Sequence, residues 1–374
     1  MRVVLAGGGT AGHIFPTLSV ARRLHSLLGD KNTDLMIVCG SRQLDVELYR
    51  DIEFDLFPIN ARGVVGVSLW KLPGRLWGLT AATIAIWREV CRRPPDVIIA
   101  SGGYISVPVL IAGWVRRIPR IIFSGDAQLG WATRALAPLA DVATVAFPDP
   151  MTQLRWTRVE MTGYPLRSIF ANTDPQAGRR QAGIKEDDAL VLVVGGSQGA
   201  HSINTAVERA LSQLLKHAVV VHVAGRSDVN WLTTTRKRLP WSLRERYHVH
   251  EFVGDGFANL MAAADLIVTR SGATSVAELG AVGTPAVIVP GTFGAGHQIA
   301  TAEAVAAAGA AVVLREAEME EGKLAPTVIG LLDNAGHLAQ MRTAAAARGQ
   351  PDAAGTVARI AIKLVDPDWE PAAA

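Results

Sequence analysis

The stretch MRVVLAGGGTAGHIFPTLSVARRL, residues 1–24, places a short apolar run directly before a glycine-rich turn and a helical pattern. The run RVVLA at 2–6 is continuously apolar, as expected of a parallel strand that is buried on both faces. Gly7, Gly9 and Gly12 have the spacing G-x-G-x-x-G, which turns a strand tightly into a helix whose N-terminus can face an anion. This unit predicts a doubly wound α/β fold.

The same rhythm continues along the chain. Further short apolar runs lie at 34–38, 96–100, 120–123 and 141–146, and again at 189–194, 218–223, 264–269 and 285–290. The second series also opens with a glycine loop, GGSQGA, and turn-forming residues fill TGYPLRSIFANTDPQAG between the two series. We therefore predict two Rossmann-like domains, 1–163 and 164–350, that face each other across a cleft. Residues 351–374 are expected to form a C-terminal helix and tail that could pack back on the first domain.

The composition is that of an ordered globular protein. Of the 374 residues, 49% are hydrophobic and 19% are charged, and a net charge of +3 is too small to indicate nucleic-acid binding. Cys39 and Cys91 lie far apart, which indicates neither a zinc site nor a disulfide framework. The apolar stretch at 105–115 is about half of a bilayer span, and the N-terminal run is too short for a signal peptide. We expect a cytoplasmic protein.

The first glycine loop has three interpretations. A nicotinamide dinucleotide site would place an acidic residue at the end of the second strand, but VCGSRQ at 38–43 has none and the first carboxylate is Asp45. His13 follows the last glycine, where a nicotinamide cofactor has no use for it. The loop could be a tight structural turn, or it could serve a reaction in which a proton moves. The cofactor interpretation is the least favoured.

The second glycine loop has two interpretations. GGSQG at 195–199 matches the nucleophile elbow G-x-S-x-G, and His297 could serve as the histidine of such a hydrolase. Alternatively, the Ser197 hydroxyl and the amides at the helix start would hold a diphosphate, helped by the positive end of the helix dipole. The hydrolase interpretation predicts nothing about the first domain, so we favour the phosphate interpretation.

Both loops together make the chain similar to the MurG family of glycosyltransferases. The family pattern GGTGGHIxPA resembles residues 8–17, and GGSQGA at 195–200 is identical to the family's phosphate loop. The stretches SGGYISVP, GYPLR and SGATSVAELGAVGTPAVIVP, which resemble other family motifs, lie at 101–108, 163–167 and 271–290. The resemblance implies a GT-B fold and the transfer of N-acetylglucosamine from UDP-GlcNAc to undecaprenyl-diphosphate-linked muramyl pentapeptide, with inversion at the anomeric carbon.

The resemblance also implies roles for individual residues. The diphosphate would contact Arg167, the ribose Glu278, the uracil Phe252 and Val253, and the sugar hydroxyls Gln298. The other residues expected at UDP-GlcNAc are Thr10, Gly12, Ser197, Gln198, Gly199, Ala273 and Thr274. The acceptor side would comprise Gly102, Gly103 and Tyr104. No metal or cofactor is expected, because the sole D-x-D, at 366–368, lies in the C-terminal tail.

Two residues are candidate catalytic bases. A neutral histidine can take a proton from an attacking hydroxyl, and the start of a helix disfavours the imidazolium form of His13. Asp126, in the loop on the acceptor side, is the rival base. A purely structural His13 that holds the glycine loop is a third interpretation.

The chain departs from the family on the acceptor side. Phe123-Ser124-Gly125-Asp126 stands where the family usually has HEQN, and Tyr164 replaces the asparagine of GNPVR. A transferase of the same family with another lipid-linked acceptor therefore remains an alternative, as does a UDP-sugar epimerase of the same fold.

A candidate membrane segment is LWKLPGRLWGLTAATIAIWREVCRR at 69–93. Its tryptophans are Trp70, Trp77 and Trp87. Tryptophan favours the headgroup layer, and anionic lipids attract the surrounding lysine and arginines. Nearby arginines that could extend the patch are Arg116, Arg117 and Arg120. We expect peripheral binding to the inner face of the cell membrane, where a polyprenyl-linked acceptor resides; an ordinary buried helix with snorkelling ends is the alternative.

Overall fold

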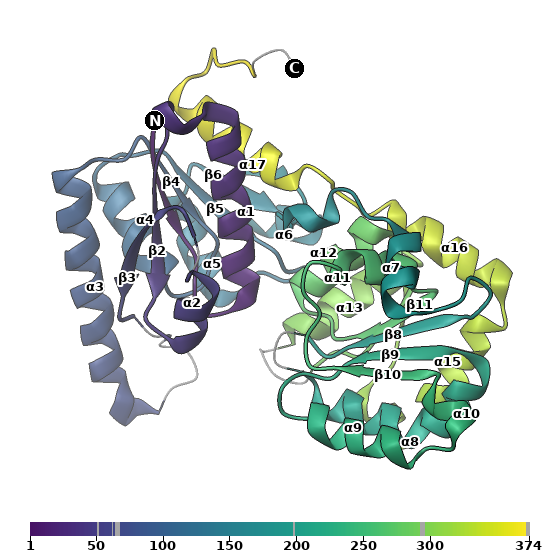
Figure 1. Cartoon of the computed structure of the whole chain (residues 1–374). Coiled ribbons are helices and arrows are strands. Elements are labelled where there is room, and N and C mark those ends of the chain that lie inside the picture. Colours follow the sequence, from purple (N-terminus) through teal and green to yellow (C-terminus); the bar gives the residue numbers. More distant parts are fainter. Residues whose placement is uncertain (51, 62, 64–67, 197–198, 292–295, 372–374) are drawn as a thin grey trace. The chain divides into compact units, whose positions relative to one another are not determined.

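The computed structural model describes residues 1–371 except 51, 62, 64–67, 197–198 and 292–295. The chain divides into two compact units. The first unit comprises Met1–Arg167 with Asp352–Ala374, and the second comprises Ser168–Pro351. Each unit contains a parallel β-sheet with helices on both faces (Figure 1).

The described strands of the first unit form one sheet in the order β3-β2-β1-β4-β5-β6-β7. Their bounds are β1 (Arg2–Ala6), β2 (Asp34–Gly40), β3 (Asp55–Ile59), β4 (Val97–Ala100), β5 (Arg120–Ser124), β6 (Val142–Val145) and β7 (Arg158–Met161). All neighbouring pairs are parallel. The chain changes direction across the sheet between β1 and β4, so the loops after these two strands lie where ligands bind in such folds.

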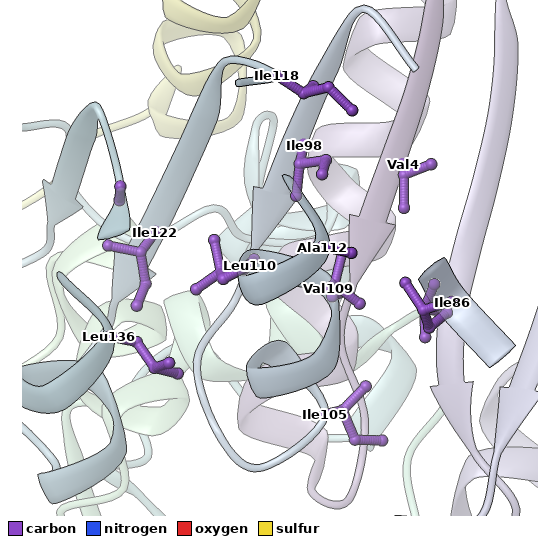
Figure 2. Close-up of a cluster of buried hydrophobic side chains, with 14 of the residues drawn as sticks. Val4, Ile86, Ile98, Ile105, Val109, Leu110, Ala112, Ile118, Ile122 and Leu136 are labelled. Carbon is purple, nitrogen blue, oxygen red and sulfur yellow. The ribbon is translucent and has the colours of Figure 1, made fainter. Parts of the chain in front are cut away.

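The helices of the first unit cover the two faces of this sheet. Their bounds are α1 (Ala11–Leu28), α2 (Gln43–Leu48), α3 (Leu72–Arg92), α4 (Ser106–Val115), α5 (Trp131–Leu136), α6 (Asp149–Gln153) and α17 (Ala353–Val365), with short 3-10 turns η1 (Asp30–Asn32), η2 (Leu69–Lys71) and η3 (Ala137–Leu139). Side chains alternate along each strand, so successive residues pack into different cores. Val4 of β1 belongs to the core that includes residues of α3, α4 and α5, some of which Figure 2 shows, whereas Val3 and Leu5 belong to the core that includes residues of α1 and α17.

The helix α17 belongs to the first unit although it ends the chain (Figure 1). It buries Val357, Ala358, Ala361 and Ile362, which form one stripe of the helix and join the core that contains α1. The two alanines allow the helix backbone to approach its neighbours closely. This packing holds α1 on the face of the sheet opposite to α3 and α4.

The described strands of the second unit form one sheet in the order β10-β9-β8-β11-β12-β13. Their bounds are β8 (Leu190–Val194), β9 (Val219–Val223), β10 (Tyr247–His250), β11 (Leu266–Thr269), β12 (Ala286–Ile288) and β13 (Ala311–Val313). The helices are α7 (Pro175–Ala182), α8 (His201–His217), α9 (Val229–Arg238), α10 (Trp241–Arg244), α11 (Phe257–Ala263), α12 (Ala273–Val282), α13 (His297–Ala307), α14 (Glu316–Glu320), α15 (Leu324–Leu332) and α16 (Ala335–Ala346), with η4 (Ser168–Phe170). Here the direction changes between β8 and β11, so the loop 195–200 and the start of α12 lie at the expected binding edge.

The predicted fold class, two Rossmann-like α/β domains, is confirmed. Within the described part of the chain, no helix has both the length and the apolar character needed to cross a bilayer. One detail of the sequence analysis is wrong: Arg120 does not extend a basic surface. It is 8% exposed, it forms an ion pair with Asp141 at 2.9 Å, and it donates a hydrogen bond to the Gly113 carbonyl.

Candidate active site residues

The first glycine loop is held by a carboxylate of the protein itself. Asp45, on α2, is 1% exposed, and its Oδ1 accepts hydrogen bonds from the amides of Gly9 at 2.7 Å and Gly40 at 3.3 Å. The hydroxyl of Tyr49, the residue directly after α2, donates to the Gly7 carbonyl at 2.9 Å. In a dinucleotide site the loop amides face a pyrophosphate. Because the Gly9 amide instead bonds Asp45, the loop geometry argues against the nicotinamide interpretation.

The loop after β4 provides the space for the imidazole of His13. Gly102 and Gly103 have φ values of +82° and +73°, in a region that favours glycine. A Cβ at Gly103 would lie 3.1 Å from Nε2 and Cδ2 of His13. A side chain larger than hydrogen would therefore displace the half-buried imidazole. Tyr104 follows, with the Arg42 guanidinium 5.3 Å from its ring centroid.

The two candidate bases influence each other. Burial lowers the pKa of His13, while the negative charge of Asp126 and a hydrogen bond to the Ser101 backbone oppose this shift. Burial is the largest of these effects, so the imidazole is neutral at neutral pH. A neutral imidazole beside a carboxylate can accept a proton, and the carboxylate would then stabilise the imidazolium.

The first turn of α1 is fixed by residues that the sequence analysis missed. The Thr17 hydroxyl donates to the His13 carbonyl at 2.8 Å and lies 2.7 Å from the Ser101 hydroxyl, so it links α1 to the loop beneath the imidazole. Both hydroxyls are buried. A Cβ on Gly7 would collide with Thr17, which explains a glycine there. The available signal was Thr17 itself, a polar residue among apolar positions of the helix.

The segment 163–167 also contacts the start of α1. The hydroxyl of Tyr164 donates to the Gly12 carbonyl at 2.8 Å, and its ring packs edge to face against Phe123, with centroids 5.5 Å apart. The guanidinium of Arg167 lies over Phe15, 5.0 Å from the ring centroid. Phe123 and Tyr164, two departures from the family pattern, therefore form one buried aromatic pair.

In the second unit, close contacts require the glycines of the loop 195–200. Gly196 and Gly199 have φ values of +85° and +77°, and a Cβ at Gly199 would lie 2.6 Å from the Ala224 carbonyl oxygen. A Cβ at Gly195 would collide with the Ala200 amide. Ser197 and Gln198 lie outside the described residues. The N-cap residue of α8, Ala200, has no side chain that could accept a hydrogen bond from the first amides of α8, which carry the partial positive charge of a helix start.

The turn after β10 borders a pocket. Phe252 is 72% exposed and Val253 is half-buried. Together with Gly178 and Gln181 of α7, they line a cavity of about 260 Å³. The turn is one of the parts that the family resemblance assigns to the uracil.

The remaining predicted donor residues lie on α12 and α13. Ala273 and Thr274 begin α12, and Glu278, one turn later, is 6% exposed. The Gln298 carbonyl accepts a hydrogen bond from the Ser271 hydroxyl at 2.7 Å, and its Oε1 accepts one from the Gly291 amide at 2.8 Å. These bonds hold the start of α13 beside the end of β11.

Each unit thus gathers its predicted residues at the carboxyl edge of its own sheet. The first unit holds Thr10, Gly12, His13, Gly102, Gly103, Tyr104, Asp126 and Arg167. The second holds Gly199, Phe252, Val253, Ala273, Thr274, Glu278 and Gln298. Among the described residues, no group of three or more histidine, cysteine or acidic side chains could hold a metal ion.

Comparisons with known proteins place the chain in a family. Residues 3–145 match the glycosyltransferase family 28 N-terminal domain, and residues 190–357 match the C-terminal domain of that family. A relative from Salinibacter ruber is 35% identical over 97% of this chain and 97% of its own length, and one from Mycolicibacterium vanbaalenii is 36% identical over 97% and 90%. Both are named UDP-N-acetylglucosamine--N-acetylmuramyl-(pentapeptide) pyrophosphoryl-undecaprenol N-acetylglucosamine transferase. The chain belongs to the MurG family of glycosyltransferases.

Solved structures agree with this family assignment. The crystal structure of Acinetobacter baumannii MurG superimposes with a TM-score of 0.76 at 25% identity, covering 97% of this chain and 99% of that one. A Neisseria meningitidis UDP-GlcNAc 2-epimerase bound to UDP-GlcNAc has a TM-score of 0.67 at 13% identity, covering 97% and 100%, and shares the fold. As a member of the MurG family, the chain is a glycosyltransferase. The sequence identity of the chain is 35% and 36% to the two named transferases but 13% to the epimerase, and this difference favours transfer over epimerisation.

Proposed function

We propose that this chain transfers N-acetylglucosamine from UDP-GlcNAc to undecaprenyl-diphosphate-linked MurNAc-pentapeptide, a step of peptidoglycan synthesis. The observation that carries the proposal is 35% identity over 97% of the chain to a relative named for this reaction. The site geometry supports it, because a neutral imidazole beside a carboxylate in the first unit is suited to deprotonate a hydroxyl.

The proposal assigns most of the donor contacts to the second unit, and the remaining ones to residues of the first unit. The amides at the start of α8 would stabilise the diphosphate leaving group, since charge that develops there is met by oriented dipoles. Glu278 would accept hydrogen bonds from the ribose hydroxyls, the turn at Phe252 and Val253 would bind the uracil, and Gln298 would contact the sugar. Further proposed donor contacts are Thr10, Gly12, Arg167, Gly199, Ala273 and Thr274.

The proposal assigns proton transfer to the first unit. His13 would take the proton of the acceptor hydroxyl as the oxygen attacks the anomeric carbon and the bond to UDP breaks. Asp126 would stabilise the imidazolium that forms. A single displacement assisted by one base inverts the anomeric carbon. Gly102, Gly103 and Tyr104 would border the acceptor, because their loop holds the imidazole.

Exposed tryptophans support a membrane surface formed by η2, which contains Trp70, and the adjoining helix α3, which contains Trp77. Trp70 is 95% exposed and Trp77 is 76% exposed, whereas Trp87 packs against the core of the first unit. Lys71 and Arg75 lie between the exposed pair. Exposed tryptophans with neighbouring cations suit the headgroup layer of an anionic membrane. We therefore propose that the chain acts at the inner face of the cytoplasmic membrane, bound peripherally through η2 and α3.

A second acceptor remains a candidate because of one specific observation. Phe123 and Tyr164 are 3% and 4% exposed and pack together where the family pattern has a histidine and an asparagine. The polar groups usual at these positions are thus replaced by an aromatic pair. This change favours an acceptor on a polyprenyl diphosphate whose sugar or peptide differs from the muramyl pentapeptide.

One assay separates these functions. The protein is incubated with labelled UDP-GlcNAc and, in parallel, with lipid-linked MurNAc-pentapeptide, with other polyprenyl-diphosphate sugars, and without acceptor. Labelled lipid-linked disaccharide from the first acceptor alone is the expected result. Label on another acceptor would replace the proposed substrate. Altered UDP-sugar without acceptor would indicate an epimerase and contradict the proposal.

A further inference from the structure

Four buried polar side chains of the second unit form a hydrogen-bond network close to Gly199. They are Asn204 of α8, His222 of β9, Asp228 before α9 and Tyr247 of β10. Asn204, His222 and Tyr247 are 0% exposed, and Asp228 is 8% exposed. Burying this many polar groups costs free energy unless each finds a partner. The hydrogen-bond partners of these four side chains therefore show which parts of the backbone the side chains hold in place.

The direction of each hydrogen bond made by Asn204 and His222 in this network can be deduced. The Asn204 amide nitrogen donates to the Ala224 carbonyl at 2.9 Å and to Asp228 Oδ2 at 2.7 Å, and neither of these oxygens can donate in return. The Asn204 carbonyl oxygen must then accept from His222 Nε2, 2.9 Å away. The other ring nitrogen, Nδ1, accepts from the Tyr247 hydroxyl at 2.9 Å. The imidazole is thereby held in a single tautomer.

The protonation states leave this arrangement intact near neutral pH. Burial lowers the pKa of His222 to about 3, although the charge of Asp228 opposes the shift. Burial also raises the pKa of the Tyr247 hydroxyl. The imidazole is therefore neutral and the phenol protonated, as the deduced bond directions require.

The network ends at the backbone after β9, against which Gly199 of the second glycine loop packs. The Ala224 carbonyl, which Asn204 holds, is the atom against which Gly199 packs so closely that a Cβ would lie 2.6 Å away. The backbone amide of Asn204 also donates a hydrogen bond to the Ala200 carbonyl at 2.9 Å, and this bond closes the first turn of α8. Asn204 thus fixes both the start of α8 and the end of β9, between which Gly199 is held.

We propose that His222 and Tyr247 are positioning residues for the donor's diphosphate. They orient Asn204, which sets the place of Gly199 and of the first amides of α8. This inference rests on the proposed function, in which those amides bind the diphosphate of UDP-GlcNAc. The pair touches no substrate, and its effect is confined to the phosphate end of the nucleotide.

The test compares ligands that differ only in their phosphates. Tyr247→Phe keeps the ring and removes the hydroxyl, so His222 loses the donor at Nδ1. Dissociation constants for uridine and UDP are measured by calorimetry with the full chain. A lost hydrogen bond of this kind corresponds to about a fivefold to tenfold change. We expect UDP to bind about fivefold to tenfold more weakly and uridine to bind as before.

Two substitutions of His222 and one control variant complete the test. His222→Gln retains a donor and an acceptor, so it should keep more of the UDP affinity than His222→Leu, which retains neither. Tyr49→Phe is the matched control, because it too removes a buried tyrosine hydroxyl, which in this case donates to the Gly7 carbonyl in the first unit. It should leave the ratio of UDP to uridine affinity unchanged.

Each outcome decides the inference. A ratio of UDP to uridine affinity that falls in Tyr247→Phe and His222→Leu supports it. An unchanged ratio, or an equal loss for both ligands, overturns the positioning role and leaves the proposed function standing. If the unaltered protein binds neither UDP nor UDP-GlcNAc, the proposed function is wrong and the inference fails with it.

Discussion

At the scale of single residues, the surroundings of His13 decide its chemistry. Its type and its place after a glycine loop are visible in the sequence, but its neighbours are not. Ser101 and Gly103 follow β4, and Asp126 follows β5, about 90 and 113 positions away along the chain. Parallel strands bring these loops to one edge of the sheet, where burial lowers the pKa of the imidazole.

The first prediction separates the two candidate bases. In Asp126→Asn the charge that raises the pKa of His13 is gone, so the acid limb of the kcat/KM profile should move to lower pH. The rate at pH 8 should fall but remain measurable. If Asp126 were itself the base, the variant would lose the acid limb and nearly all activity. His13→Ala, expected to lower kcat by about 10²–10⁴-fold, completes the comparison.

The second prediction concerns stability and His222. The pKa of this buried imidazole is about 3 in the folded protein, below its usual value near 6.5. Protons therefore bind the unfolded chain more readily, and stability is lost as the pH falls from about 6.5 towards 3. The slope contributed is about 1.4 kcal/mol per pH unit. Urea unfolding at pH 7, 5.5 and 4.5 should show a smaller loss for His222→Gln; an equal loss would contradict this account.

At the scale of elements, central strands were predictable and edge strands were not. Every apolar run of the sequence analysis corresponds to a strand, whereas β3, β7, β10 and β13 contain no such run. These four strands lie at sheet edges and have mixed exposure. An edge strand has a neighbour on one side only, so its sequence lacks the continuous apolar pattern of a buried strand. For helix α3, the sequence did not show which tryptophan is exposed: Trp77 lies on the surface, whereas Trp87 packs against the core.

The third prediction tests the exposed tryptophans of η2 and α3. Trp70→Ala combined with Trp77→Ala should weaken binding to vesicles that contain anionic phospholipid by at least tenfold, since each buried aromatic side chain contributes about 1.5–3 kcal/mol. Sedimentation with vesicles measures this. Trp241→Ala is the control, since Trp241 is 70% exposed but lies on α10 of the second unit. An equal loss in both proteins would contradict a membrane surface on η2 and α3.

The fourth prediction tests the loop beneath the imidazole. In Gly103→Ala the added Cβ meets His13 at 3.1 Å and the residue must keep a φ of +73°. The imidazole should move, so kcat should fall by about 10²-fold, as expected for a displaced catalytic group. Affinity for UDP should be unchanged, because the second unit is unaltered. A normal kcat would show that this contact does not position the base.

At the scale of the whole molecule, the chain uses one architecture twice with different loop chemistry. The first glycine loop bonds an internal carboxylate, Asp45, and precedes a histidine. The second precedes α8, whose N-cap residue Ala200 has no capping side chain, and is supported by a buried hydrogen-bond network around Asn204. This difference is the physical basis for assigning proton transfer to the first unit and the nucleotide to the second.

The fifth prediction tests that division. Glu278→Gln should weaken UDP-GlcNAc binding about 10- to 100-fold, since a hydrogen bond to a charged group contributes about 1.5–3 kcal/mol. His13→Ala should bind UDP-GlcNAc like the unaltered protein while losing turnover. Calorimetry and a turnover assay on the same preparations distinguish the two effects. Loss of donor binding in His13→Ala would contradict the division.

The sequence by itself determined the fold class and the position of both glycine loops, because buried parallel strands and tight turns restrict residue type locally. It also determined the family, since motifs such as GGSQGA and SGATSVAELG are short continuous stretches. Only the tertiary structure decided which side chains meet. Asp45 bonds Gly9, Thr17 meets Ser101, and His222 orients Asn204. These contacts join residues of different elements, and their energies depend on distance and burial, which no local pattern encodes.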